Sequence, residues 1–151
     1  GGGWYENLRV DAAQAGARCP RIHNTVDTSG AISQQFEAKY GPLPFAMTLT
    51  YEPVAGSAGV YSKYADGARA LLKLPTVFLD VGGAAPSGGY ATAIAFTCKG
   101  ELGSAVVELQ LLSRGPALQN ATRDAMKAAA VHAGISQALV DELHVEDYSK
   151  C

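Results

Sequence analysis

Alternation of large apolar residues with small or polar ones predicts strands in the middle of the chain. Residues 45–52 follow a period of two, which is typical of a half-buried strand, and their threonines suit its open face. Residues 76–81 predict a buried strand. Residues 90–99 predict another, apolar on both sides because its alternate positions are alanine. A final strand is expected over residues 143–148.

Residues 105–113 form the expected hairpin partner of the strand over residues 90–99. Its large apolar residues and its polar residues fall on opposite faces: Val107, Leu109 and Leu111 on one, Glu108 and Gln110 on the other.

Apolar residues spaced by three or four predict helices elsewhere. A helix is expected over residues 9–17, and a short one over residues 28–41, where Ile32, Phe36 and Tyr40 are spaced by four. Residues 61–72 also follow helical spacing. The clearest helix runs over residues 115–133 with one apolar stripe, and Gly134 is placed to end it, with Ile135 folding back as a hydrophobic contact.

These elements predict an α+β fold: an antiparallel sheet of four to five strands with helices packed on one face, a two-layer sandwich. We expect a single globular domain over residues 1–151, with residues 1–30 as a candidate extended N-terminal segment. The helix, Gly-Ile turn and strand of residues 115–148 are similar to the closing unit of ferredoxin-like and SEA-like domains. That pattern carries no functional motif.

Composition and charge exclude several classes of protein. Hydrophobic residues make up 48% of the chain, which disfavours disorder, and charged residues make up 17%, below the roughly 25% of an average soluble domain. Twelve basic against 14 acidic residues give a net charge of −2, so no nucleic-acid partner is expected. The charge-free stretch 81–98 is too rich in glycine and proline for a membrane span, and a soluble domain is predicted.

Three widely spaced cysteines, Cys19, Cys98 and Cys151, exclude the motifs of zinc, iron–sulfur and haem attachment sites. A disulfide from Cys151 to Cys98 or to Cys19 would tie down the chain end, and three unrelated thiols are the alternative. With the low charge and the absence of an initiator methionine, a disulfide favours a secreted or lumenal protein. Asn120 begins a glycosylation triplet.

No motif names a reaction. The glycine-rich loop 82–89 lacks the residues of a phosphate-binding loop, and Ser87 within it lacks the nucleophile elbow, so no cofactor and no metal are expected.

Two groups of residues are candidates for acid–base chemistry. Strand alternation would place Glu142, His144 and Glu146 on one face, where the carboxylates would raise the histidine pKa; a solvated sheet edge is the alternative interpretation. His23 and Asp27 form the second candidate pair. Either group would support a small hydrolase or lyase.

Four aromatic residues suit an interface: Trp4, Tyr5, Tyr61 and Tyr64. With no catalytic arrangement evident, we expect a non-enzymatic exported domain that acts through protein–protein contact. It would be an accessory subunit of a complex or a self-assembling surface protein. A carbohydrate-binding module that stacks sugars on exposed tyrosines is the remaining alternative.

Overall fold

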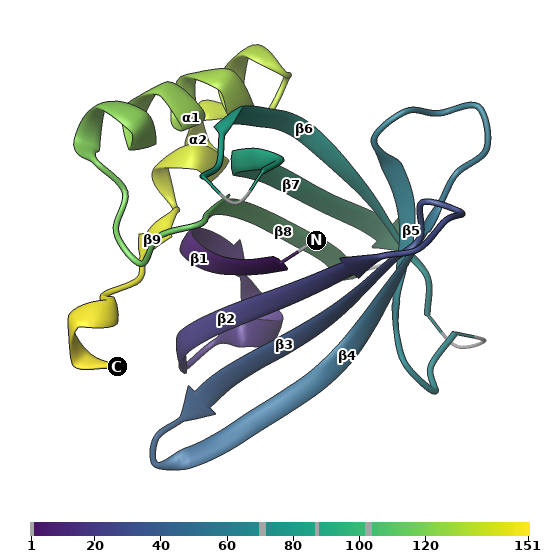
Figure 1. The fold of residues 1–151 in the computed structure, drawn as a ribbon, viewed down its shortest axis with the longest axis horizontal. Coiled ribbons are helices and arrows are strands. Elements are labelled where there is room, and N and C mark those ends of the chain that lie inside the picture. Colours follow the sequence, from purple (N-terminus) through teal and green to yellow (C-terminus); the bar gives the residue numbers. More distant parts are fainter. Residues whose placement is uncertain (1, 70–71, 87, 102–103) are drawn as a thin grey trace.

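The computed structural model describes residues 2–69, 72–86, 88–101 and 104–151 (Figure 1). The strands in these ranges are β1 (Gly2–Asp11), β2 (Ala17–Val26), β3 (Ile32–Tyr40), β4 (Leu43–Pro53), β5 (Val60–Ala65), β6 (Leu74–Ala84), β7 (Tyr90–Glu101), β8 (Ser104–Ser113) and β9 (His144–Val145). The helices are α1 (Asn120–His132) and α2 (Gln137–Asp141), with 3₁₀ turns η1 (Ala12–Gln14) and η2 (Tyr148–Lys150).

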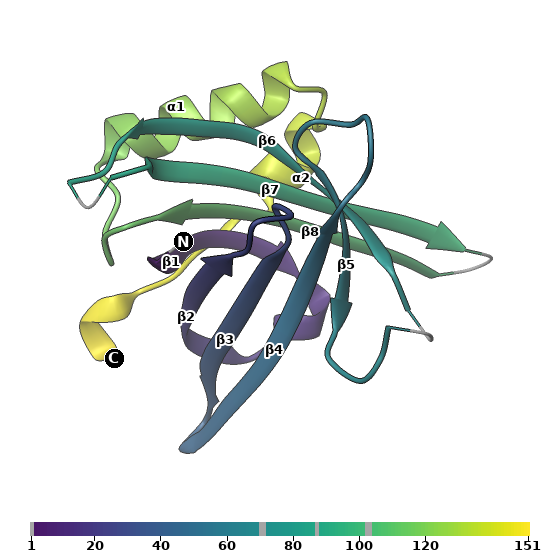
Figure 2. The ribbon, with the colours of Figure 1, turned by 45° about the vertical axis from the view of Figure 1, so that its right-hand side comes forward.

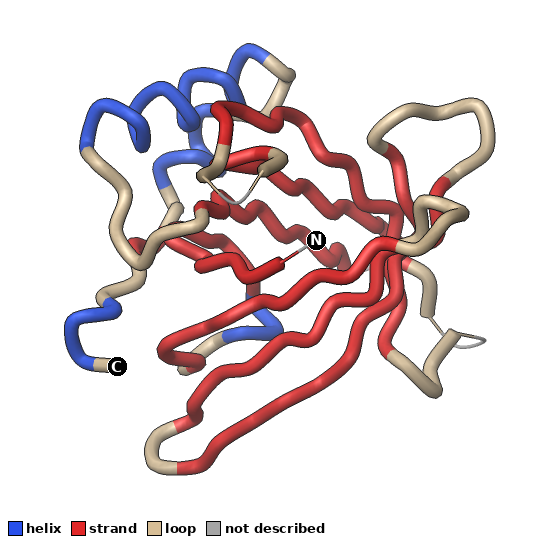
Figure 3. Tube along the Cα trace, in the orientation of Figure 1, coloured by secondary structure: helices blue, strands red, loops and turns tan. Residues whose placement is uncertain are grey.

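Strands β1 to β8 pair in chain order, each antiparallel to the next, and β1 also pairs with β8. This second pairing closes the sheet into a barrel, because β1 lies between β2 on one side and β8 on the other (Figures 1 and 3). The short strand β9 pairs with the second half of β1, where β1 no longer pairs with β2. Within the described ranges the protein is therefore an eight-strand antiparallel barrel, with β9 added on its outside.

The barrel corrects the predicted α+β two-layer sandwich. The helix expected over residues 9–17 is the end of β1, the 3₁₀ turn η1 and the first residue of β2. The helix expected over residues 28–41 is a turn followed by β3, and the described part of residues 61–72 holds β5 and a loop. The strand expected over residues 143–148 is only two residues long. Because the chain before α1 is a closed barrel, the resemblance of residues 115–148 to ferredoxin-like and SEA-like units is also wrong. Residues 2–26, from which an extended N-terminal segment was expected, supply two barrel strands.

Strand β3 shows why the apolar pattern was misinterpreted. Residues at i and i+4 share a face in a helix and in a strand alike, so Ile32, Phe36 and Tyr40 fit both. The position that distinguishes the two is Gln34, which is buried although it is polar. Buried and exposed residues alternate without interruption from Ser33 to Lys39, as a strand requires.

The larger apolar core lies outside the barrel, between its wall and the C-terminal helices. Figure 2 shows α1 running along β6 and β7. Leu109 and Leu111 of β8 pack there with Met126 and Ala130 of α1, and Val140 of α2 completes the core. Burial of this face positions α1. The apolar stripe expected from the sequence, which ran through Ala121 and Ala125, is wrong, because those two residues are exposed and Met126 and Ala130 form the buried face.

The end of α1 follows the sequence prediction. Gly134 adopts a φ of 100°, and the Ile135 N–H donates to the Ala130 carbonyl at 3.1 Å, which closes the helix. Ile135 packs into the core beside Ala130. None of the helices in the described ranges has the length and apolar character needed to cross a membrane.

Candidate functional site

Inward-facing side chains divide the barrel interior into two halves. The half near the β2–β3, β4–β5 and β6–β7 turns, called here the cavity half, is lined by Trp4, Asn24, Tyr61, Phe78, Ala93 and Leu112. The half toward the β1–β2 and β3–β4 connections, called here the polar half, holds Glu6, Arg9, Lys63, Thr97, Glu108 and Gln110. The polar face of β8, which carries Glu108 and Gln110, therefore lies inside the barrel.

A cavity of about 990 Å³ opens at the cavity half. Its walls come from β1, β2, β5, β6, β7 and β8, with Val26 and Ile32 of the β2–β3 hairpin at the rim. Part of this space is open because Ala93 of β7, which lies opposite Leu112 of β8 in the register, has a small side chain. The volume lies at the upper end of the roughly 300–1,000 Å³ typical of small-molecule sites.

Aromatic rings form one wall of the cavity. The rings of Tyr61 and Phe78 lie edge to face with their centroids 5.5 Å apart, and Tyr51 packs behind both, at 6.3 Å from Tyr61 and 6.2 Å from Phe78. The Tyr51 hydroxyl donates to Oε1 of Gln34 at 3.1 Å. Burial raises the pKa of Tyr51, so this hydroxyl remains a neutral donor. The wall is therefore held in place by ring packing and by one buried hydrogen bond.

Trp4, the sole tryptophan of the chain, forms the wall on β1. The Arg114 guanidinium lies over its ring at 3.6 Å from the centroid and donates to the carbonyl oxygens of Gly3 and Tyr90, at 2.8 and 3.1 Å. One arginine thus joins the first strand to the start of β7 and stacks on the tryptophan. This contact holds β1 in place at the cavity rim.

A buried ion pair occupies the polar half. The Lys63 ammonium of β5 donates to the Glu108 carboxylate of β8, across the barrel interior, and both side chains are almost completely buried. Nearby, the Thr76 and Thr97 hydroxyls form a hydrogen bond at 2.7 Å. These groups satisfy one another and fill the space between the strands, so the cavity does not extend through the barrel.

Glu6 lies fully buried beside this pair. Its Oε1 accepts from Gln14 of η1 at 3.1 Å, and its Oε2 lies 3.9 Å from Arg9. Burial raises the Glu6 pKa to about 7; Arg9 lowers it, while Asp11 and Glu108 add to the rise. Through Gln14, Glu6 fastens η1 at the polar end of the barrel.

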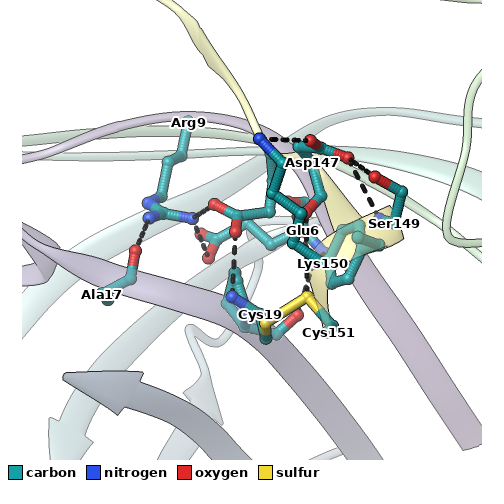
Figure 4. The surroundings of a disulfide bond; sticks show 11 residues. Glu6, Arg9, Ala17, Cys19, Asp147, Ser149, Lys150 and Cys151 are labelled. Carbon is teal, nitrogen blue, oxygen red and sulfur yellow. Dashed lines mark hydrogen bonds and ion pairs between the residues drawn. A yellow bond between two sulfur atoms is a disulfide. The ribbon is translucent and has the colours of Figure 1, made fainter. Parts of the chain in front are cut away.

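The C-terminal segment covers the gap where β1 and β2 part. A disulfide joins Cys19 to Cys151, which is one of the two bridges considered for Cys151, and Cys98 is an exposed free thiol. Arg9 donates to the Ala17 carbonyl at 2.6 Å, beside the disulfide (Figure 4). Arg9 also donates to Glu146 at 2.9 Å, and Glu146 accepts from the Cys19 N–H at 2.8 Å. Within the described ranges, the one grouping with metal-ligand spacing is Cys19, Glu146 and Cys151, whose sulfurs are already bonded to each other.

Glu142, His144 and Glu146 all line one surface pocket beside β9, but they have different surroundings. Glu142 caps the end of α2 and is exposed, His144 is exposed in β9, and Glu146 is occupied by Arg9 and Cys19. They do not share a strand face, because β9 ends at Val145. A catalytic role for them stays a prediction.

His23 and Asp27 have different surroundings. His23 is exposed on β2, and Asp27 sits in the β2–β3 turn. The Asp27 carboxylate accepts from the Ser29 hydroxyl and from the N–H groups of Ser29 and Ala31, and these hydrogen bonds lower its pKa. Asp27 therefore organises the turn.

The four aromatic residues assigned to an interface fall in different places. Trp4 and Tyr61 line the cavity. Tyr5 packs edge to face on Tyr148, at 5.1 Å between centroids, and Tyr64 donates to Glu52 at 2.9 Å on the opposite face of β5 from Tyr61. Asn120 is exposed at the start of α1, so its glycosylation stays a prediction. Ser87 lies outside the described residues.

Sequence reasoning missed the cavity residues Asn24, Phe78 and Arg114. Asn24 falls in the extended N-terminal segment expected over residues 1–30, and Phe78 falls in an expected strand to which no partner was assigned. The available signal was the alternation of residues 20–24, where Pro20, Ile22 and Asn24 are buried and Arg21 and His23 between them are exposed. The polar Asn24 interrupts that alternation in the sequence.

Several solved structures share this fold. Lobster apocrustacyanin A1 superposes with a TM-score of 0.73 at 16% identity, over 98% of this chain and 78% of that one. Insecticyanin from the tobacco hornworm Manduca sexta gives 0.73 at 13% identity, over 99% and 78%. The possum milk whey lipocalin trichosurin gives 0.64 at 14% identity, over 94% and 92%. No protein-family model and no curated protein sequence matches the chain.

At these identities the likeness shows the fold alone, a lipocalin-like eight-strand barrel. The fold corrects the prediction of a structural, self-assembling subunit, because two of the aromatic residues that supported it, Trp4 and Tyr61, line the cavity of the barrel.

Proposed function

We propose that this chain binds one small, mainly apolar ligand in the cavity half of the barrel. The observation that carries the proposal is the 990 Å³ cavity walled by Trp4, Tyr61 and Phe78. A barrel of eight strands has room for side chains or for one small ligand, and among the described residues the cavity half keeps that room. The trichosurin structure, which shares this fold, holds the small ring compound 4-ethylphenol.

The position of Trp4 supplies the experiment. Titration with 1-anilinonaphthalene-8-sulfonate, a fluorescent apolar anion, should quench Trp4 emission by energy transfer, with saturation at one probe per chain. Ala93→Leu extends an apolar side chain from a buried wall position into the cavity and should abolish the quenching. Ala128→Leu, on the exposed side of α1, is the matched control and should bind as the parent does. Equal binding by all three proteins would contradict the proposal.

A secreted or lumenal location belongs with this proposal. The Cys19–Cys151 disulfide persists in an oxidising compartment and is consistent with export. Mass spectrometry of the native protein, alkylated before and after reduction, should show one reactive thiol rising to three. Three reactive thiols before reduction would argue against export. Contact with a protein partner and glycan binding stay predictions from the sequence, as does a hydrolase or lyase activity.

A further inference from the structure

The cavity wall contains one polar side chain whose hydrogen bonding is incomplete. Asn24 is 9% exposed, and its Oδ1 is buried without a hydrogen-bond partner among the described residues. Its amide belongs to the lining of the cavity. A buried amide that lacks a partner is destabilising, so such groups are uncommon unless something else supplies the bond.

The strand next to Asn24 offers a direct contrast. Asn24 of β2 lies opposite Gln34 of β3 in the register, and both amides point into the barrel. Oε1 of Gln34 accepts the Tyr51 hydroxyl at 3.1 Å, so this amide is paired with a phenol of the protein itself. Asn24, unlike Gln34, belongs to the lining of the cavity.

We propose that Asn24 selects ligands that carry a hydroxyl group, with the ligand's aromatic body against Tyr61 and Phe78. This inference rests on the proposed ligand-binding function and deepens it. A hydroxyl both donates and accepts, so it pairs with an amide in either orientation of the amide group. The ring wall beside it suits a flat apolar body, since aromatic rings favour edge-to-face and offset contacts. The ligand class is therefore a small phenol or a similar hydroxylated ring.

The test compares two probes that differ by the hydroxyl alone, 4-ethylphenol and ethylbenzene. Their dissociation constants are measured by calorimetry on the parent chain, on Asn24→Leu and on Thr25→Val. Leucine has nearly the shape of asparagine, and removing an unpartnered polar group in this way should leave the fold intact. Thr25 is exposed on the outer face of the same strand and serves as the matched control.

The preference for 4-ethylphenol over ethylbenzene should fall about five- to tenfold in Asn24→Leu, the size of one net hydrogen bond, and stay unchanged in Thr25→Val. If Asn24→Leu fails to fold, Asn24→Ala gives the same comparison. An equal preference in the parent and the variant would overturn the role of Asn24. If neither phenol nor hydrocarbon binds while anilinonaphthalene sulfonate still binds and Ala93→Leu blocks it, this inference fails and the proposed function stands. If no probe binds, both fail.

Discussion

The two halves of the barrel interior are built from the same eight strands but differ in charge and in free space. In the polar half, Lys63 is paired with Glu108 and Glu6 accepts from Gln14, while Oε2 of Glu6 and Oε1 of Gln14 have no hydrogen-bond partner among the described residues. In the cavity half, one wall is aromatic, and Oδ1 of Asn24 faces open space without a hydrogen-bond partner among the described residues. Charges that neutralise one another fill a barrel and hold its strands together, whereas small residues and an unpaired amide leave space for a ligand. The polar half therefore stabilises the barrel, and we propose that the cavity half binds a small ligand.

The largest expected effect comes from breaking the ion pair in the polar half. Lys63→Met leaves the Glu108 carboxylate buried without its partner, which should lower the free energy of unfolding by about 3–5 kcal/mol. Urea denaturation measures the loss. Lys63→Met combined with Glu108→Leu should recover much of it, and Lys39→Met, exposed on the outer face of β3, should change little. A loss in Lys63→Met no larger than in Lys39→Met would remove the structural role of this half.

The second effect is a pH dependence that arises at Glu6. A folded-state pKa of about 7 lies above the ordinary glutamate pKa of 4.5, so the folded protein binds the proton more tightly than the unfolded chain does. Stability is therefore fully present below about pH 4.5 and is lost as the pH rises toward and through 7, by about 3 kcal/mol in total.

Glu6→Gln keeps an acceptor for Gln14 and removes the titration. Its stability relative to the parent should rise across that pH window, when unfolding by denaturant is followed from pH 4 to 8. Glu37→Gln, exposed on the outer face of β3, should show no such rise. If the free energies of unfolding of the parent and of Glu6→Gln change with pH in parallel, burial does not raise the pKa of Glu6.

The third effect distinguishes the cavity wall from the outer face of the same strand. Tyr61→Leu keeps an apolar side chain but removes the ring that contacts Phe78, and should weaken binding of anilinonaphthalene sulfonate about fivefold. Tyr64→Leu, on the opposite face of β5, should bind the probe as the parent does. Equal weakening in both variants would place the probe outside the cavity.

The smallest effect is expected at the rim. Arg114→Met removes the stacking on Trp4 and two hydrogen bonds to carbonyls, and should lower the free energy of unfolding by about 1 kcal/mol. Trp4 emission should shift to longer wavelength as water reaches the ring. Arg18→Met, exposed on β2, is the control. An unchanged emission spectrum would mean that Arg114 does not shield Trp4.

Part of this protein follows directly from local sequence. The helical spacing of apolar residues over 115–133 predicts α1, and Gly134 with Ile135 predicts how it ends, because both depend on neighbours within a few residues. The strands over residues 45–52, 76–81, 90–99 and 105–113 are confirmed as β4, β6, β7 and β8, with β7 and β8 as a pair.

Only the tertiary structure decides which face of each strand is inside. The alternation in β8 shows that Glu108 and Gln110 share a face opposite Leu109. A closed barrel covered by a helix offers two buried environments for these faces, the barrel interior and the core under α1. The leucines pack under α1, so the polar face turns inward, where Lys63 from a strand 45 residues away supplies the partner for Glu108. Polar residues at inward positions made β1, β3 and β5 resemble helices or loops. The cavity follows from the same closure, because Trp4, Asn24 and Phe78 meet only when β1 pairs with both β2 and β8.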